Sequence, residues 1–318
     1  MAHATGRRRA RGARHRDDGG VRIAVTGSSG LIGTALVTAL HSAGHDVVRL
    51  VRRQARHPDE VSWDPVAGTL DVDRLAGVDA AVNLAGAGIG DRRWNDDYKR
   101  TVLGSRVDST RTLVKALTCL DPLPRVLVSG SAVGYYGDRG DEPLTEASGP
   151  GTGFVTEVCQ AWEDAAAPAA DAGVRVVLAR TGLVLSPDGG ALGRLLPLAR
   201  LGLAGPLGSG RQWWPWITLD DEVRALMFLL EHDEVAGPVN LSAPQPTRNA
   251  DLTRAVGAAL HRPALLPAPA FALRLVLGEF AGEVLSSQRM LPARLLEAGF
   301  QFHHQTPAQA AGWAVDRP

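Results

Sequence analysis

The feature that most constrains the fold is a set of three glycines, Gly27, Gly30 and Gly33, separated from one another by two residues. Residues 23–25 before them are short, apolar and largely β-branched, as a buried parallel strand requires, and residues 31–40 have the apolar spacing of a helix. In such a strand-to-helix turn, the first glycine allows a tight bend, the second lets backbone N–H groups approach a pyrophosphate, and the third lets the helix lie close to the strand. An ordinary glycine-rich turn is the alternative, but the flanking strand and helix favour a dinucleotide site. The expected contacts are Thr26, Gly27, Ser28, Ser29, Gly30, Leu31, Ile32 and Gly33.

The end of the second predicted strand, residues 45–51, indicates which dinucleotide is bound. An NAD site usually has Asp or Glu there, about 20 residues after the glycines, to bind the ribose 2′-hydroxyl. This chain has Arg52 and Arg53 instead. A carboxylate would repel a 2′-phosphate, whereas a guanidinium can hold it through paired, charge-assisted hydrogen bonds. The pair therefore predicts NADP(H), against the alternative that two surface arginines merely solvate a loop.

Strands and helices alternate through the first 185 residues, and this alternation predicts an α/β fold with a Rossmann-type, doubly wound parallel sheet. The expected strands are residues 23–25, 47–51, 80–84, 126–129 and 174–179, and the expected helices are about 31–42, 95–118 and 154–171. After Arg180 the sequence becomes loop-like and rich in tryptophan, which predicts a smaller C-terminal substrate lobe. We therefore expect a disordered leader at 1–20, an NADP-binding Rossmann domain at 21–185 whose sheet is free to recruit later segments, and a lobe at 186–318. The lobe includes a C-terminal module at about 264–312.

Charge and cysteine content exclude several classes of partner. Lys and Arg together number 34, as do Asp and Glu, so no global field recruits nucleic acid or an anionic membrane. The basic run at residues 7–16 is not a secretory signal, because no apolar segment follows it before the first strand. We expect it to be a solvated leader or to lie upstream of the true start; a nucleic-acid arm is the alternative. The longest apolar stretch, residues 264–277, is too short and too interrupted to cross a membrane. Two cysteines, Cys119 and Cys159, allow no disulfide framework, so we expect a soluble, cytoplasmic protein.

Two further motifs lie where strands end, at the edge where an open α/β sheet binds its ligand. The first, Asn83-Leu84-Ala85-Gly86, is expected to line the adenosine side of the cofactor, and the second, residues 129–137, brings serines and two phenols to the same edge. With the glycine motif and Trp216-Ile-x-x-Asp220-Asp221, they resemble the extended short-chain dehydrogenase/reductases of the NAD(P)-dependent epimerase/dehydratase kind.

The resemblance narrows to an atypical branch of that superfamily. Motifs such as Arg93-Trp94 and Gly205-Pro-Leu-Gly-Ser-Gly210 are similar to proteins usually labelled epimerase-family, sometimes cell-division-inhibitor-like, that end in a small module of unknown function. The similarity covers residues 21–312. It implies a Rossmann-type fold with NADP(H) but supplies neither a substrate nor a reaction.

The chain departs from the family at the residues that carry the chemistry. The superfamily moves protons with a Tyr-x-x-x-Lys pair on the helix beside the nicotinamide, where the lysine lowers the pKa of the tyrosine. The corresponding residues here are Phe154 and Val158, which carry neither a phenol nor an ammonium. The serine that usually polarises the substrate oxygen corresponds to Ser131 or, one position along, to Ala132, and Thr218 stands where the superfamily often has histidine.

Two classes of function fit this sequence. In the first, the protein is an NADP(H)-dependent oxidoreductase or epimerase for an unknown small molecule, with Ser131 at the substrate oxygen and the proton donor moved to Tyr135, Tyr136 or Glu146. Each has a structural alternative, because the tyrosines can pack with the hydroxyl reaching solvent and the glutamate can cap a turn. In the second class, the protein binds NADP(H) without turnover and reports the state of the cofactor to a protein partner.

No metal site is predicted. His41 and His45 have helical spacing, but Gly44 between them is a helix stop, and His303-His304 lacks a second pair of ligands. The sequence leaves a homodimer open.

Overall fold

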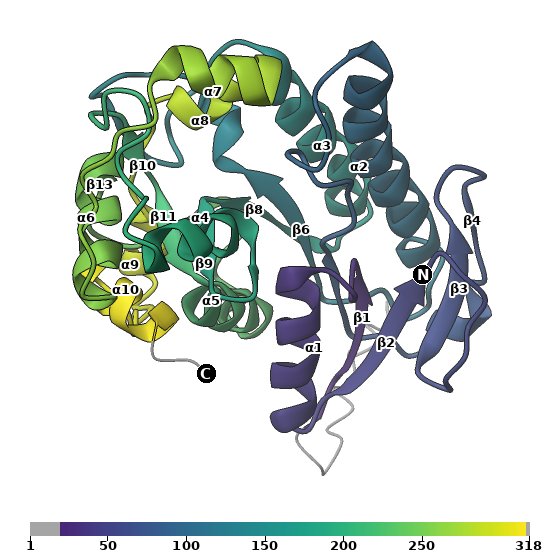
Figure 1. The fold of residues 1–318 in the computed structure, drawn as a ribbon. Helices are drawn as coiled ribbons and strands as arrows, with labels where there is room; N and C mark the ends of the chain where they lie inside the picture. The colour runs from purple at the N-terminus through teal and green to yellow at the C-terminus, as the bar shows by residue number, and fades with distance from the viewer. Residues whose placement is uncertain (1–19, 316–318) are drawn as a thin grey trace, which may run out of the picture.

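A sheet of eight strands organises the computed structural model, which describes residues 20–315 (Figure 1). The predicted leader at 1–20 lies outside the described residues, apart from Gly20. The strand order is β12-β8-β6-β5-β1-β2-β3-β4, and all neighbours run parallel except β3 and β4. The strands are β1 (Arg22–Thr26), β2 (Asp46–Val51), β3 (Glu60–Asp64), β4 (Thr69–Leu70), β5 (Ala80–Asn83), β6 (Val126–Ala132), β8 (Arg175–Thr181) and β12 (Gly237–Leu241).

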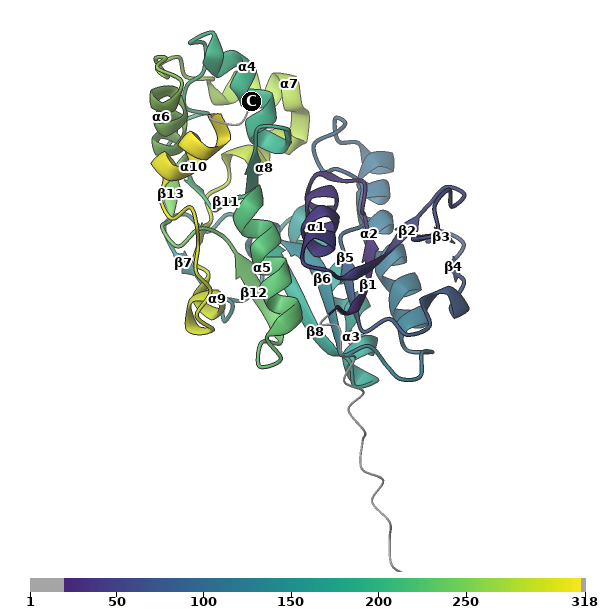
Figure 2. The same cartoon turned by 90° about the horizontal axis from the view of Figure 1, so that it is seen from below.

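Helices cover both faces of the sheet because successive side chains of a strand point to opposite sides. On β1, Ile23 and Val25 belong to the apolar cluster that includes α1 (Leu31–Ser42) and α5 (Leu219–Glu231). Ala24 belongs to the opposite cluster, which includes α2 (Asp96–Leu117) and α3 (Phe154–Asp171). Figure 2 shows the two helical layers from below. The predicted doubly wound, Rossmann-type sheet is confirmed.

The structure adds three strands to the five that the sequence predicts. β3 and β4 extend the sheet beyond β2 at one edge, and β12 extends it beyond β8 at the other. β3 alternates buried Val61 and Trp63 with exposed Ser62 and Asp64, so it lacks the continuous apolar run of a central strand. β12 begins with Gly237-Pro238, residues that interrupt a strand pattern.

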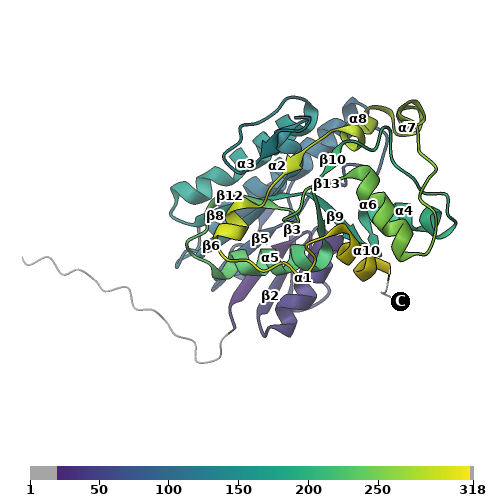
Figure 3. The ribbon, with the colours of Figure 1, turned by 90° about the vertical axis from the view of Figure 1, so that its left-hand side faces the viewer.

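The rest of the chain forms a smaller lobe at the end of the sheet that β8 and β12 form, on the side that faces the viewer in Figure 3. Its own apolar cluster centres on Trp214 and Trp216, which are 9% and 1% exposed, so these two tryptophans belong to the core. Its helices are α4 (Gly190–Arg200), α6 (Asn249–Ala259), α7 (Ala270–Leu277), α8 (Ala281–Leu285), α9 (Ala293–Glu297) and α10 (Pro307–Val315). Its two-stranded ladders pair β10 (Trp213–Trp214) with β13 (Thr247–Arg248) and β11 (Trp216–Thr218) with β9 (Leu183–Ser186).

Two segments tie this lobe back to the residues around the sheet. β14 (Arg289–Met290) pairs with β7 (Pro143–Leu144), which lies in the loop between β6 and α3. The turn η3 (Gly278–Phe280) reaches the start of α2, where Glu279 forms an ion pair with Lys99 and Phe280 packs on Trp94. The two remaining 3-10 turns are η1 (Asp73–Leu75) and η2 (Val133–Tyr136). Within residues 20–315, no helix has the length and apolarity needed to cross a membrane.

Candidate functional site

The glycine turn between β1 and α1 brings two stretches of backbone into close contact. Gly27 has φ +65°, and a Cβ atom there would lie 2.5 Å from the carbonyl oxygen of Leu84. A Cβ atom on Gly33 would lie 2.2 Å from the carbonyl oxygen of Gly27. Both positions therefore exclude a side chain, as the sequence predicts for a tight turn against a closely packed helix.

The N-terminus of α1 is open to a ligand. Its N-cap residue is Gly30, no side chain caps the first turn, and that turn contains no acidic residue. The first N–H groups of a helix lack partners within it and carry the positive end of its dipole. This end of α1 can therefore hold a phosphate group.

A cleft of about 330 Å³ lies over this helix end. One wall is the glycine turn and the start of α1, and the rest comes from the carboxyl ends of β5, β6 and β8, from α3 and from the smaller lobe. The lining residues are Gly27, Gly30, Leu31, Ile32, Gly33, Leu84, Gly130, Ser131, Trp162, Thr181, Gly182, Leu183, Val184 and Gly190. Sequence reasoning missed Trp162 and residues 181–184 as site residues, although Thr181 ends a strand at the same edge as Ser131.

The side chains of Thr26 and Asn83 lie beneath the cleft in a buried network. Both residues are 0% exposed, and the Thr26 hydroxyl donates to Asn83 Oδ1 at 2.7 Å. The same Thr26 oxygen accepts the backbone N–H groups of Leu84 and Ala85, both at 3.1 Å. Asn83 Nδ2 donates to Thr110 Oγ1 at 2.8 Å. This network fixes the turn at 84–86 against β1, and Leu84 lines the cleft on the side of β1 away from β2.

The two arginines after β2 have different surroundings. Arg53 donates from both Nη atoms to the two carboxylate oxygens of Glu60, each at 2.7 Å. Glu60 is 0% exposed, and these bonds, together with the N–H of Arg56, lower its pKa to about 2. Arg52 is exposed and forms no hydrogen bond or ion pair with another residue in the described range 20–315. Of the predicted pair, Arg52 is therefore the one free to bind a ligand phosphate.

A buried ion pair lies directly behind Ser131. The Ser131 hydroxyl donates to Glu163 Oε1 at 2.6 Å. Arg180 donates from Nε to Oε1 and from Nη2 to Oε2 of Glu163, each at 2.8 Å. The side chains of Arg180 and Glu163 are 4% and 9% exposed. Although burial opposes it, this carboxylate raises the pKa of Arg180, so the guanidinium stays charged. The arrangement fixes the rotamer of Ser131 at the wall of the cleft.

The two tyrosines after β6 differ in accessibility. Tyr136 is 0% exposed; its hydroxyl donates to Asn240 Oδ1 at 2.6 Å and accepts from Arg180 Nη1 at 3.1 Å. Burial raises the pKa of Tyr136 from its usual value. Tyr135 is half-buried, with its ring centroid 3.4 Å from the Arg180 guanidinium carbon. Neither ring is among the groups that line the cleft.

Glu146 lies outside the cleft as well. Its Oε1 accepts the backbone N–H groups of Asn240 at 3.0 Å and Arg294 at 3.2 Å, so it joins β12 to the start of α9. Its Oε2 is buried without a hydrogen-bond partner in the described structure.

The start of α3 carries aromatic and aliphatic groups where the family resemblance suggests a tyrosine and a lysine. Phe154 packs edge-on against Trp94, with ring centroids 5.2 Å apart, and Val158 is 2% exposed in the same apolar cluster. The ammonium of Lys99 lies 5.5 Å from the Phe154 ring centroid. Neither Phe154 nor Val158 can donate a proton from its side chain.

A fully buried acid, Glu222 on α5, is a feature that sequence reasoning missed. It is 0% exposed, and its Oε1 accepts from Thr181 Oγ1 at 2.8 Å, while Oε2 has no partner in the described structure. Burial raises its pKa to about 8. Its acidic neighbours Asp220 and Asp221 suggest an ordinary charged first turn of a helix, so no signal in the sequence distinguishes it.

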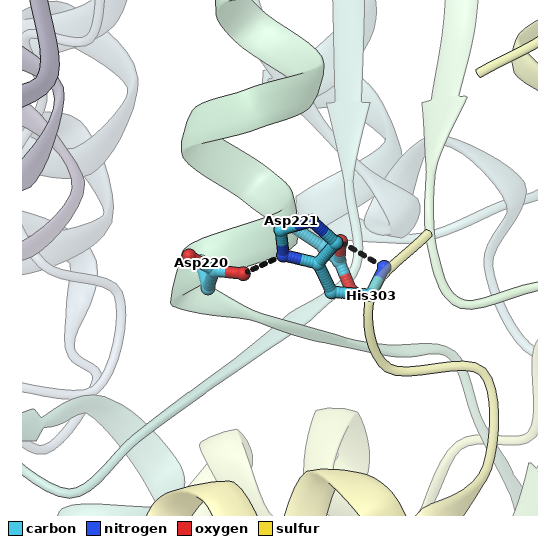
Figure 4. Close-up of side chains that lie close together, drawn as sticks. All are labelled: Asp220, Asp221 and His303. Atoms are coloured by element: carbon cyan, nitrogen blue, oxygen red, sulfur yellow. Dashed lines mark hydrogen bonds and ion pairs between the residues drawn. The ribbon is translucent and has the colours of Figure 1, made fainter. Parts of the chain in front are cut away.

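Asp220, Asp221 and His303 offer three possible metal ligands, whose atoms lie within 4.8 Å of one another (Figure 4). Each is already engaged. His303 Nδ1 pairs with Asp220 Oδ2 at 2.8 Å, and its backbone N–H donates to Asp221 Oδ1 at 2.8 Å. The other oxygen of Asp221 accepts the N–H of His304 at 2.9 Å, and Arg224 also donates to Oδ1. These hydrogen bonds hold His303 and His304 against the start of α5.

Comparison with known proteins identifies related sequences over nearly the whole chain. Residues 23–242 match the model of the NAD dependent epimerase/dehydratase family, and residues 268–314 match a domain of unknown function, DUF1731. The epimerase family protein Mb2239 of Mycobacterium bovis is 48% identical over 297 residues, which cover 93% of this chain and 98% of that protein. Human SDR39U1, also an epimerase family protein, is 38% identical over 286 residues and is covered to 95%.

Two solved structures are similar both in sequence and in fold. A crystal structure of human SDR39U1 (isoform 2) with NADPH superposes with a TM-score of 0.87 at 36% identity, covering 94% of this chain and all of that one. A nucleoside-diphosphate sugar epimerase from Corynebacterium glutamicum superposes with a TM-score of 0.78 at 36% identity, covering 94% of this chain and 59% of that one.

Proposed function

The chain belongs to the NAD dependent epimerase/dehydratase family, and on this premise we propose that it binds NADP(H) and acts as an oxidoreductase or epimerase on a small molecule. The observation that carries the choice of cofactor is Arg52, an exposed guanidinium with no partner among the described residues, at the end of the strand next to the glycine turn. NADPH in the crystal structure of human SDR39U1 supports the same choice.

The residues of the cleft fit such a cofactor. The N–H groups at the start of α1 suit its pyrophosphate, and Gly27 and Gly33 allow the close backbone packing that forms the turn. Arg52 suits the 2′-phosphate, since a guanidinium can make two charge-assisted hydrogen bonds to it. Leu84, Gly130 and Trp162 border the remaining half of the cleft, so this proposal places the turn at 83–86 beside the nicotinamide half and not on the adenosine side that is expected from the sequence.

When bound, NADP(H) supplies or accepts a hydride at its nicotinamide ring. Among the predicted catalytic residues, we propose that Ser131 contacts the substrate oxygen, because it lines the cleft and Glu163 fixes its hydroxyl. Tyr135 is the proposed proton donor, since the residue is only half-buried and its ring lies beside the Arg180 cation. Tyr136 and Glu146 have weaker support, because both are bonded to β12.

The experiment is a titration of the full chain with NADPH and, separately, with NADH, followed by cofactor fluorescence. We expect NADPH to bind at least about 10-fold more tightly, which corresponds to one charge-assisted hydrogen bond. Free 2′,5′-ADP should displace it. Equal affinity for the two cofactors would contradict the proposal.

A second candidate function is cofactor-dependent regulation without turnover. Phe154 and Val158 favour it, because neither side chain can move a proton to or from a substrate at the positions where the family resemblance suggests a tyrosine and a lysine. A protein of this kind would bind NADPH with the expected preference yet fail to oxidise it with any of a panel of carbonyl and sugar-nucleotide substrates. Rapid oxidation of NADPH by one of them would remove this candidate.

A further inference from the structure

Arg106 on α2 places a guanidinium between two segments that border the cleft. Its Nη1 donates to the carbonyl oxygens of Ala87 at 2.9 Å and Val102 at 3.0 Å. Its guanidinium carbon lies 5.0 Å from the ring centroid of Trp162, which lines the cleft. On the other side, a Cβ atom on Gly86 would lie 3.2 Å from the same guanidinium carbon, so the 84–87 turn lies directly against the cation.

This cation has no carboxylate partner among the residues that the structure describes. No acidic residue in the described range 20–315 forms an ion pair with Arg106, whereas the other guanidinium in this region, Arg180, is held by both oxygens of Glu163. Burial lowers the pKa of Arg106, and the opposing effects of Cys159 and Tyr98 do not cancel it. A buried charge without a partner costs stability, and an acceptor supplied by a ligand would offset that cost.

The donors of Arg106 are incompletely used. Nη1 has two acceptors, but Nε and Nη2 donate to no other residue in the described part of the chain. Neither atom is among the buried polar atoms that lack a partner, so both keep some accessible surface. An arginine offers five N–H donors in a fixed plane, and the unused edge of this one suits a pair of neighbouring oxygens.

The order of the sheet indicates which part of the cofactor comes near. Arg52 follows β2 on one side of β1, and the phosphate-binding end of α1 follows β1 itself. The other half of a dinucleotide must then extend across the ends of β5 and β6, past Leu84 and Gly130. Trp162 and the 84–87 turn, which hold Arg106 between them, border this half.

We infer that Arg106 donates hydrogen bonds to the ribose hydroxyls in the nicotinamide half of the cofactor. The inference rests on the proposed binding of NADP(H). Arg106 on α2 would then supply the positive charge that the family resemblance suggests at position 158 of α3, where this chain has the uncharged Val158.

The test compares two ligands with the full chain by calorimetry. NADPH contains both halves of the cofactor, whereas 2′,5′-ADP contains only the adenosine half. Arg106→Leu should weaken NADPH binding by about 10-fold or more and leave 2′,5′-ADP within twofold of the parent. Arg106→Lys keeps a charge but loses the planar donors; it should weaken NADPH binding too, and it serves if the leucine variant does not fold. Arg111→Leu, an exposed arginine on the same helix, is the matched control and should change neither affinity.

The outcomes separate the inference from the function on which it rests. NADPH affinity within twofold of the parent in both Arg106 variants would overturn the inference. Equal weakening of the two ligands would also overturn it, because a merely structural role affects the whole cleft. A parent protein that bound neither ligand would overturn the proposed function and this inference together.

Discussion

Replacing Arg52 by alanine isolates the contact that we propose for the 2′-phosphate. Arg52 has no partner among the described residues, so its removal breaks no bond within that part of the protein. A hydrogen bond to a charged group contributes roughly 1.5–3 kcal/mol, which corresponds to a loss of about 10-fold to 150-fold in NADPH affinity. NADH lacks the phosphate, and its affinity should stay within a factor of about two.

Arg53→Ala is a control from the adjacent residue. Arg53 is occupied by two bonds of 2.7 Å to Glu60, so its removal should leave the ratio of NADPH to NADH affinity nearly unchanged. It should instead lower the thermal midpoint, because the buried Glu60 carboxylate loses its main partner. Both variants are titrated with both cofactors at the same low ionic strength, since salt screens an exposed charge.

The reasoning is refuted by either of two results. One is an unchanged cofactor preference in Arg52→Ala. The other is a loss of preference in Arg53→Ala as large as that in Arg52→Ala, which would mean that Arg53 exchanges Glu60 for the ligand.

Two predictions concern buried groups near the cleft. Burial raises the pKa of Glu222 to about 8 in the folded protein, against 4.5 in the unfolded chain. Between these two pH values the folded state binds a proton that the unfolded state has lost. The free energy of unfolding therefore falls as the pH rises through this window, by up to about 1.4 kcal/mol per pH unit. Chemical denaturation should therefore find Glu222→Gln more stable than the parent at pH 8 and similar to it at pH 4.5, and a parallel loss at both pH values would contradict the assignment. Tyr136→Phe removes the hydroxyl between Arg180 and Asn240 and should cost about 1–3 kcal/mol in the free energy of unfolding, whereas the half-buried Tyr135→Phe should cost little; equal losses would show that the two phenols are equivalent.

The central fold follows from local sequence patterns. The glycine turn and the apolar runs at 23–25 and 126–129 predict strands that are buried on both faces, and these strands are present. β12 is not predicted because an edge strand has only one neighbour and tolerates the proline that it contains, and β3 is not predicted because it alternates buried with exposed residues beside the two-residue edge strand β4. Their places in the sheet depend on contacts with β2 and β8, which no local pattern encodes.

The candidate site is predictable where backbone geometry determines it and unpredictable where side chains choose partners. The glycine spacing predicts the turn, but the sequence does not distinguish Arg52 from Arg53. Only the fold brings Glu60 to one of them. In the same way, Glu163, Arg180 and Ser131 come from three different elements, and their network depends on the packing of α3 against β6 and β8.

The position of β12 has a consequence for the order in which the protein can be assembled. β8 pairs with β6 on one side and with β12 on the other, and β12 lies beyond α4 and α5 in the sequence. Until residue 241 has left the ribosome, the nascent sheet ends in an unpaired β8 whose backbone groups can join another strand. A fragment cut at residue 185 would keep that bare edge permanently and lose the Asn240 amide that binds Tyr136. Such a fragment should therefore associate with itself, whereas in the full chain β12 pairs with the exposed edge of β8.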